Sequence, residues 1–431
     1  MIEKAAKFSF YAFLLIFPFG YRWEVLRFIP GFHEYESVFL YASDLFLVLF
    51  LIMGTAVLFS KKERTKKGKS ILFLIYFLTA AIFSLIFSPL FILSICFLLR
   101  LFTLAGAAFL ISELIRKKTI EVKNILGIIS LGAIFQSAVA FFQFKFQKSL
   151  GLYFLGEPML SSNTPGISKI TADGAKIIRA YGTFLHPNIL SAFLIMGFLA
   201  LLYFYFKKEN LKEKILILIF SYPVLLAIIL TFSRQAWIAL LMSIFFLSIM
   251  IILKKKMTGV KKMIPIFLAL VFAVIPAKDF ILERAPISTK EDAVTERLAY
   301  NEMGISLIKE NPFGSGLGTQ VSYAYKNGFY EKFGMTKSWL WQPIHNIYLL
   351  IASETGILGI TLFLAFVLSL LIPIKKISLE IAVIKINFLA FLIIGISDHF
   401  FWTIGQGQIM LWLLIGLLMQ NSCKIENQES I

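Results

Sequence analysis

The sequence predicts an all-α membrane protein that crosses the bilayer about twelve times. Of its 431 residues, 58 % are hydrophobic and 16 % are charged, which is more apolar than ordinary soluble domains. The apolar residues form continuous runs of about 17–25 residues, the length of a membrane-spanning helix. A bacterial β-barrel would instead alternate polar and apolar residues in segments of about ten.

We expect the twelve spans to form one integral-membrane domain over residues 1–431. The first should be a retained helix and not a signal peptide, because no small-residue cleavage site follows it. The third and fourth should be separated by a short loop at Ser88 and Pro89. The expected spans are 5–20, 38–59, 70–88, 90–112, 124–144, 187–206, 214–232, 235–253, 263–277, 346–372, 381–400 and 405–420.

One large polar loop, residues 278–345, separates the ninth span from the tenth. Ser288 and Glu291 fit a capping box, which predicts a helix ending near Lys309. The glycine-rich segment 311–318 follows this helix. A dinucleotide-binding loop would follow a strand, so we interpret the segment as a turn that ends the helix.

The net charge of +17 is distributed unevenly along the chain. With the N-terminus inside, the inner loops hold the excess of Lys and Arg, whereas basic and acidic residues balance in the outer segments. Both termini should therefore be cytoplasmic, and the loop 278–345 periplasmic. The basic balance reflects topology and contact with anionic membrane lipids, and it gives little reason to expect nucleic acid as a partner.

His345 and Asn346 lie where the large loop meets the tenth span. The nearby aromatic residues Trp339, Trp341 and Tyr348 fit an interfacial belt, but such a belt does not account for a His–Asn pair at that depth. His345 is a candidate general base, because the pKa of histidine lies near neutral pH. Asn346 is a candidate substrate ligand.

Three arginines lie within or beside apolar segments, where a charge is costly unless it is paired or functional. Arg179 and Arg234 fall at the outer surface and could bind phosphate oxygens through two nitrogens at once. His186 and Asn188 follow Arg179 and are further candidate substrate ligands. Arg100 falls near mid-membrane, where it could contact substrate or form a structural ion pair.

The partners considered for an ion pair with Arg100 are Asp44, Glu354 and Asp398. The two cysteines, Cys96 and Cys423, offer neither a disulfide framework nor metal-ligand spacing. No Asp-x-Asp pair or His/Cys cluster occurs in the sequence, so we expect a site without metal or cofactor.

The chain resembles the O-antigen ligase and polymerase superfamily of bacterial membrane glycosyltransferases, which implies a membrane glycosyltransferase C-like fold. Several stretches carry this resemblance in the family's order. They are Tyr41–Asp44, Gln136–Gln143, Leu155–Pro158, Arg179–Asn188, Thr231–Arg234, Asn311–Gly318, His345–Leu349 and Glu354–Gly356.

The resemblance implies transfer of a glycan from undecaprenyl pyrophosphate to an acceptor, without a required metal, at the periplasmic face of the bacterial inner membrane. It also implies that Arg179, Arg234 and His345 correspond to the family's essential arginines and histidine. The twelve spans and the long loop before His345 favour a ligase, which uses a lipid A-core sugar as acceptor.

A polymerase of the same superfamily, or a member that glycosylates proteins, remains an alternative. A non-enzymatic glycolipid transporter is a further alternative. Transport would require polar groups distributed through the spans, whereas here the ionisable groups cluster at the outer ends and Arg100 alone lies deep.

The charge distribution predicts the topology directly. Reporter fusions near Lys66 and Lys326 should report opposite sides of the membrane, because the basic excess marks the loop around Lys66 as cytoplasmic. Alkaline phosphatase and fluorescent-protein fusions would measure this. Two fusions on the same side would refute both the span assignment and the grouping of Arg179, Arg234 and His345.

Overall fold

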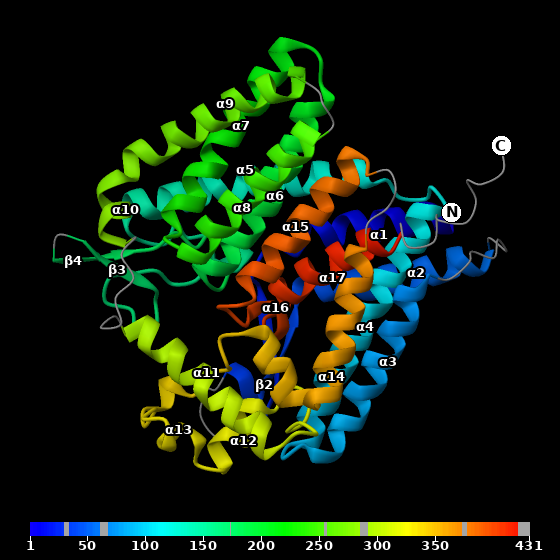
Figure 1. Cartoon of the computed structure of the whole chain (residues 1–431), viewed down its shortest axis with the longest axis vertical. Helices are drawn as coiled ribbons and strands as arrows, with labels where there is room; N and C mark the ends of the chain where they lie inside the picture. The colour runs from blue at the N-terminus through cyan, green and yellow to red at the C-terminus, as the bar shows by residue number, and fades with distance from the viewer. Residues whose placement is uncertain are drawn as a thin grey trace.

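The computed structural model describes residues 1–29, 34–60, 68–172, 174–253, 257–284, 292–372 and 377–420. Within these residues it is almost entirely helical (Figure 1). Nine helical segments are long and apolar enough to cross a membrane, which makes the chain a polytopic membrane protein. These segments contain α2 (Ala42–Ser60), α3 (Lys69–Ser84), α4 (Phe91–Arg116), α5 (Val122–Phe146), α6 (Pro187–Lys207), α7 (Leu211–Leu230), α8 (Arg234–Leu253), α9 (Met257–Val274) and α14 (Ile347–Leu371).

The other three expected spans are shorter helices. They are α1 (Ile2–Ile16), α15 (Leu379–Ile394) and α17 (Gly405–Met419), with 15, 16 and 15 residues. At about 1.5 Å per residue, each is shorter than the roughly 30 Å apolar core of a bilayer. The structure thus supports nine full-length spans among the described residues, where the sequence led us to expect twelve.

The expected span 381–400 was wrong at its end. Helix α15 stops at Ile394, and the chain turns through residues 395–399 into the four-residue helix α16 (Phe400–Thr403). The turn carries Asp398 and His399, both buried, and leaving the helix allows these two polar residues to face protein groups. The expected break at Ser88 and Pro89 is confirmed, because α3 and α4 are separate helices.

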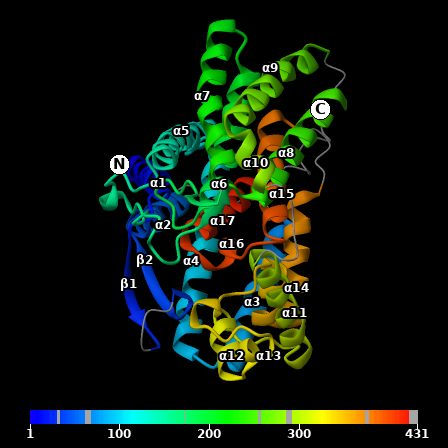
Figure 2. The same ribbon diagram turned by 90° about the vertical axis from the view of Figure 1, so that its left-hand side faces the viewer.

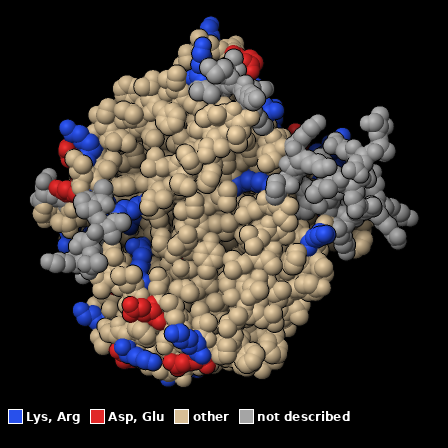
Figure 3. All heavy atoms as spheres, viewed as in Figure 1, with Lys and Arg blue, Asp and Glu red and all other residues tan. Residues whose placement is uncertain are grey.

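Helix α6 lies at the centre of the molecule (Figures 1 and 2). Most of its residues are buried, and it packs against α5, α7 and α15. The face of the molecule seen in Figure 3 is largely uncharged, and most of its visible charged side chains lie near the margins. This is the surface expected of a protein surrounded by lipid.

The large loop folds into short helices below the bundle in Figure 1. These are α11 (Asp292–Glu310), α12 (Gln320–Lys326) and α13 (Phe329–Lys332). Helix α10 (Lys278–Arg284) lies instead beside the end of α9 in Figure 1 and forms the last part of the candidate membrane span Lys261–Arg284. The predicted helix ending near Lys309 is confirmed as α11, although its expected capping residues Ser288 and Glu291 lie outside the described residues.

Two small antiparallel hairpins complete the fold. Strand β1 (Arg22–Arg27) pairs with β2 (Ser37–Tyr41), and β3 (Lys169–Ala172) pairs with β4 (Ala175–Ile178). In Figure 2 the hairpin of β1 and β2 lies along the outside of the helices. Trp23, Val25 and Leu26 are exposed on β1, giving this hairpin an apolar outer surface.

The glycine-rich segment after α11 is a structural turn, as predicted, and it is bound to α14. Gly356 interrupts α14 with φ 75° and ψ 177°, a conformation essentially restricted to glycine. The segment supplies the hydrogen bonds lost at this kink. The amides of Ser315 and Gly316 donate to the carbonyl oxygens of Ser353 (2.8 Å) and Glu354 (3.1 Å), and the Ile357 amide donates to Pro312 (2.9 Å).

Replacing Gly356 should therefore destabilise the protein. A Cβ there would lie 2.6 Å from the carbonyl carbon of Phe313, and its positive φ disfavours any side chain. We expect Gly356→Ala to cost about 1–3 kcal/mol and to lower the thermal unfolding midpoint in detergent. Gly106→Ala on α4 is the matched control, because its new Cβ would meet only the Leu51 side chain at 3.7 Å. Equal midpoints for the two variants would contradict the role of the kink.

Candidate active site

The buried carboxylate of Asp398 joins three parts of the chain. Its Oδ2 accepts hydrogen bonds from Asn188 Nδ2 (2.6 Å), near the start of α6, and from Gln235 Nε2 (2.9 Å), near the start of α8. Its Oδ1 accepts from the backbone amide of His399 at 2.9 Å. The carboxylate therefore fixes the turn after α15 against the first turns of two other helices.

Arg179 extends this network. Its Nη2 donates to Asn188 Oδ1 and its Nε to the carbonyl oxygen of Thr231, both at 2.6 Å. A weaker bond of 3.4 Å joins its Nη1 to Ser168 Oγ. Burial lowers the pKa of Arg179 to about 9, and the nearby Arg284 and Arg297 also lower it. The hydrogen bonds of this guanidinium within the described residues are thus all to neutral groups.

His186 belongs to the same cluster and also begins α6. Its Nδ1 accepts from the amide of Asn188 (3.2 Å), and its Nε2 lies 3.0 Å from Ser168 Oγ. Burial, followed by the charge of Arg179, lowers its pKa to about 3. A neutral ring is consistent with its capping bond, since the capping nitrogen must accept a proton donor.

The turn that carries Arg179 and His186 rests on two buried glutamines of α5. Gln143 donates to Gly182 O (2.8 Å) and accepts from the amides of Tyr181 and Gly182. Gln136 accepts from the amide of Thr183 at 2.9 Å. Two of the stretches that carried the family resemblance thus include residues that support this turn. The second is Leu155–Pro158, whose Glu157 accepts from Gln143 Nε2 at 2.8 Å.

His345 lies just before α14 with a defined tautomer. Its Nδ1 lies 3.0 Å from the carbonyl oxygen of Pro343, and because a carbonyl can only accept, Nδ1 carries the proton. In the neutral ring, Nε2 is then the proton acceptor. Burial lowers the pKa of His345 to about 3, with further lowering by His399 and Arg297, so the imidazole is neutral at pH 7.

Aromatic rings fix the orientation of His345. Tyr300 of α11 stacks on it with ring centres 4.9 Å apart, and His399 meets it edge-on at 4.7 Å. His399 in turn lies 5.5 Å from the ring of Tyr35, and its Nδ1 is 2.7 Å from Thr403 Oγ1. The large loop thereby contributes directly to the position of the candidate base.

Further arginines surround this cluster. The charge of Arg297, on α11, lowers the pKa values of His186, His345 and His399. Its Nε is buried and has no hydrogen-bond partner within the described residues. Arg234 begins α8, where its Nη1 donates to the carbonyl oxygen of Arg284 at 3.4 Å.

Asp398 is the carboxylate among these cationic groups. Burial alone would raise its pKa, but the imidazoles of His399 and His345 and the guanidinium of Arg297 lower it overall. Among the described groups whose charges act on Arg179 and Asp398, the guanidinium groups of Arg179, Arg284 and Arg297 outnumber the one carboxylate, that of Asp398. An anionic group with several oxygens, such as a pyrophosphate, fits that excess.

Two predicted site residues lie apart from this cluster or have a structural role in it. Asn346 caps α14, with its Oδ1 accepting from the amides of Tyr348 (2.9 Å) and Leu349 (3.2 Å). Arg100 forms the expected ion pair, and its partner is Asp44. Arg100 also donates from Nε to Gln408 Oε1 at 3.3 Å.

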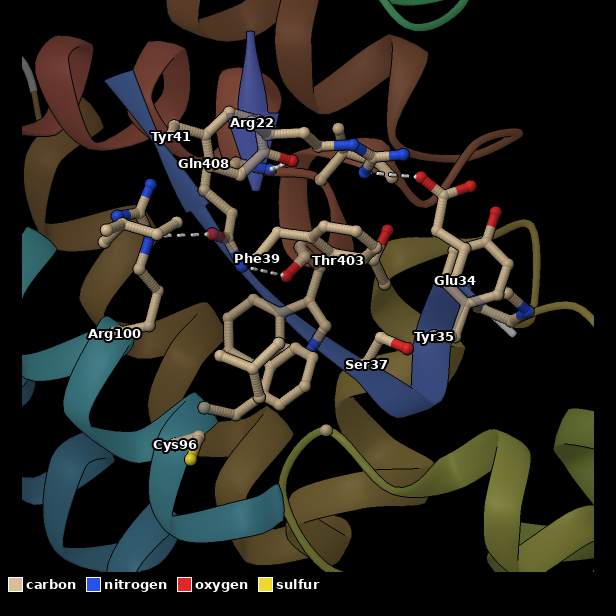
Figure 4. A pocket seen from close by; sticks show the side chains of 18 of the residues that line it. Arg22, Glu34, Tyr35, Ser37, Phe39, Tyr41, Cys96, Arg100, Thr403 and Gln408 are labelled. Carbon is tan, nitrogen blue, oxygen red and sulfur yellow. Dashed lines mark hydrogen bonds and ion pairs between the residues drawn. The ribbon is translucent and has the colours of Figure 1, made fainter. Parts of the chain in front are cut away.

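Arg100 lines a cavity of about 240 Å³ next to the cluster (Figure 4). The cavity lies between the hairpin of β1 and β2, helices α2 and α4, and the segment from α16 to α17. Tyr35, Pro343 and Thr403 form part of its wall. Tyr35 and Thr403 also contact His399, and the carbonyl oxygen of Pro343 lies 3.0 Å from His345 Nδ1, so these residues lie between the cavity and the two histidines.

The structure thus brings Arg179, His186, Asn188 and His345 together through residues that the sequence did not assign to the site. Asp398 was considered only as an ion-pair partner, and Gln235, Arg297, Tyr300 and His399 were missed. The available signal was the polar pair Asp398-His399 inside an otherwise apolar run, which interrupts the expected span. Among the described residues, no three His, Cys, Asp or Glu side chains are arranged to hold a metal ion.

Residues 215–364 match the family model described as O-antigen ligase. This segment belongs to the O-antigen ligase family. The match includes Arg234, Arg297, Tyr300 and His345, whereas Arg179 and Asp398 lie outside it. Among curated proteins, none is similar enough to the chain to count as a match.

An O-antigen ligase family domain indicates a membrane glycosyltransferase of the ligase and polymerase type, and the family's substrates are in general lipid-linked glycans. The nine long apolar helices found in the described part of the chain agree with a multi-pass membrane protein.

Proposed function

We propose that the protein transfers a glycan from undecaprenyl pyrophosphate to a sugar hydroxyl at the periplasmic face of the bacterial inner membrane. The observation that carries this proposal is the neutral imidazole of His345, whose Nε2 can accept a proton beside a group of arginines. These are the two functions that such a transfer requires. A base activates the acceptor, and positive charge stabilises the leaving pyrophosphate.

In the proposed reaction, the acceptor hydroxyl gives its proton to His345 Nε2 while its oxygen attacks the anomeric carbon of the donor. The bond from that carbon to the pyrophosphate oxygen breaks, and undecaprenyl pyrophosphate leaves with the bonding electrons. Attack from the face opposite the leaving group inverts the anomeric configuration. The approaching pyrophosphate would also raise the pKa of His345, since a nearby negative charge favours the imidazolium.

We assign pyrophosphate binding to Arg179 and Arg234, assisted by Arg297. Two observations on the described residues support this assignment: Arg297 Nε is buried without a hydrogen-bond partner among them, and guanidinium groups outnumber carboxylates among the charges that act on Arg179 and Asp398. His186 and Asn188 hold Arg179 and the start of α6 in place, so their contribution is to position the donor site. Asn346 places His345 by capping the helix that follows it.

Within the family, we favour the ligase reaction, which would place the protein in lipopolysaccharide and cell-envelope synthesis. The large loop supports this choice. Its helix α11 supplies Tyr300 and Arg297 to the site, and His345 follows at the end of the same loop. In a transporter, by contrast, the polar network would have to serve both faces of the membrane. Here it is concentrated where α6, α8 and α14 begin.

Arg234→Lys should retain the fold but lose most transfer activity. An arginine can contact two phosphate oxygens at once, whereas a lysine offers a point charge. Hydrogen bonds to charged groups contribute about 1.5–3 kcal/mol each, so the transfer rate should fall at least tenfold. The measurement is the rate with purified enzyme and lipid-linked donor.

Arg116→Lys is the matched control for this variant. Arg116 pairs with Glu113 at the far end of α4, and the substitution preserves the charge of the pair. Full activity in Arg234→Lys would show that Arg234 only anchors α8.

His345→Ala should fold and bind donor but transfer no glycan, because it removes the proton acceptor. His345→Gln separates the base role from simple orientation, since glutamine forms hydrogen bonds but cannot accept the proton. We expect both variants to be inactive in a transfer assay that also measures donor binding. Wild-type activity should survive chelators. Retained activity in His345→Gln would instead indicate that His345 orients the acceptor.

A further inference from the structure

The hairpin of β1 and β2 turns an apolar face away from the protein. In its register Trp23 pairs with Leu40, and Leu26 pairs with Val38. Because side chains alternate along a strand, these four residues share one face of the hairpin. Trp23, Leu26 and Leu40 are 49 %, 45 % and 50 % exposed. An antiparallel sheet with one face in water normally shows the opposite arrangement, with its polar face outward.

The polar side chains lie on the other face and are paired within the protein. Arg22 Nη1 lies 2.7 Å from Glu34 Oε1, and its guanidinium lies 4.0 Å from the centre of the Phe39 ring. Figure 4 shows Arg22 and Phe39 beside the cavity, which both residues line. At the other end of β1, Arg27 Nη2 lies 2.5 Å from Glu24 Oε2. The hairpin therefore has no unpaired arginine with which to attract an acidic partner.

The hairpin also lies beside a membrane-spanning helix. Strand β2 continues directly into α2, and Asp44, in the first turn of α2, pairs with Arg100 of α4. Arg100 is the tenth residue of α4, about 14 Å along the helix from its first residue. Strand β2 packs against α4, and Figure 2 shows the hairpin extending along the outside of the helices. The strands thus run beside the first turns of the candidate span Phe91–Arg116.

The apolar face of the hairpin is continuous with surface that meets lipid. Leu45 and Val48 of α2 and Leu99 of α4 are exposed, and they belong to candidate membrane spans. Exposed apolar side chains on such spans contact the bilayer. Leu40 of β2 and Leu99 of α4 line the same cavity, so the hairpin and the span are neighbours at this surface.

The backbone of the hairpin restricts how deep it can lie. Among the described strands this sheet has two members, so each strand has one backbone edge without a strand partner, and hydrocarbon offers such an edge no hydrogen bonds. Helix α4 has 26 residues and a length of about 39 Å, which exceeds the roughly 30 Å apolar core. Its first turns can therefore reach the head groups. Tyr21 and Trp23, whose ring centres are 4.9 Å apart, are residue types that gather at that level.

We infer that the hairpin of β1 and β2 is seated in the head-group region of the bilayer, with its apolar face against the acyl chains. The leaflet is the one that holds the first turns of α4, which the charge distribution predicts to be periplasmic. Apolar contact holds the lipid here, because the charged groups of the hairpin are paired. The hairpin then separates the lipid on one face from the cavity on the other. This seat does not depend on the reaction that the protein catalyses.

The test places a nitroxide spin label on the apolar face through Trp23→Cys and, independently, through Leu26→Cys. The native Cys96 and Cys423 are first replaced by alanine, and the full chain is reconstituted in phosphatidylcholine vesicles. Electron paramagnetic resonance then measures how often the label collides with oxygen, which concentrates in hydrocarbon, and with a water-soluble nickel chelate.

Two matched positions calibrate the measurement. Leu241→Cys is the lipid control, because Leu241 is exposed on the membrane-spanning helix α8. Lys309→Cys is the water control, because Lys309 is an exposed charged residue near the end of α11.

We expect both hairpin labels to favour oxygen over the nickel chelate, as the label at Leu241 does. The label at Trp23 should lie deeper than the label at Leu26 by up to about 7 Å, because these residues pair with positions two apart on β2, nearer to α2 and farther from it. Replacing part of the phosphatidylcholine by phosphatidylglycerol should leave both results unchanged.

Three results would overturn the inference. Collisions with the nickel chelate as frequent as at Lys309 would place the apolar face in water. Labels shielded from both reagents would show that a protein, such as a second copy of this chain, covers the face. Contact with hydrocarbon only in vesicles that contain phosphatidylglycerol would show that charge, and not apolar contact, holds the hairpin at the membrane.

Discussion

The carboxylate of Asp398 is the interaction on which the arrangement of the site depends. Its hydrogen bonds to Asn188 and Gln235 connect the starts of α6 and α8 with the turn after α15. Through Asn188 it also determines where Arg179 lies. A buried carboxylate is costly unless polar partners surround it. These partners and the neighbouring cationic groups stabilise the ionised form of Asp398. Its negative charge therefore holds the starts of α6 and α8 in place and also reduces the positive potential of the nearby arginines.

The two sides of His345 follow from this arrangement. Toward Asp398, the guanidinium of Arg179 donates to the amide oxygen of Asn188 and to the carbonyl oxygen of Thr231, and a guanidinium held by neutral groups can still bind an anion. Toward the cavity, arginines are paired with carboxylates, and what remains available is hydrogen bonding and aromatic surface. His345, the proposed proton acceptor, has neighbours in both environments. The stacked ring of Tyr300 and the bond to Pro343 hold that acceptor at the boundary between them.

Much of the fold could be predicted from hydrophobic runs, because apolar length is a direct requirement of the bilayer. The helix α11 and the glycine-rich turn after it also followed from local signals. The end of α15 could not be predicted, since its turn exists to place Asp398 and His399 against distant helices. For the same reason Arg179 and His345 could be identified as unusual residues, whereas Gln235 and Arg297 could not. Their significance comes from contacts between helices far apart in the sequence.

The hydrogen bonds between the glycine-rich segment and the kink of α14 have a consequence for how members of this family can diverge. Three backbone hydrogen bonds make the end of α11, the segment 311–318 and the first third of α14 one mechanical piece. Tyr300 and His345, which stack on each other, both belong to it. Exchanging the loop between relatives at the start of α14 would therefore combine the glycine-rich segment of one protein with the α14 kink of another, and the hydrogen bonds between them could be lost. A functional chimera should carry its junction beyond Gly356, inside the membrane helix.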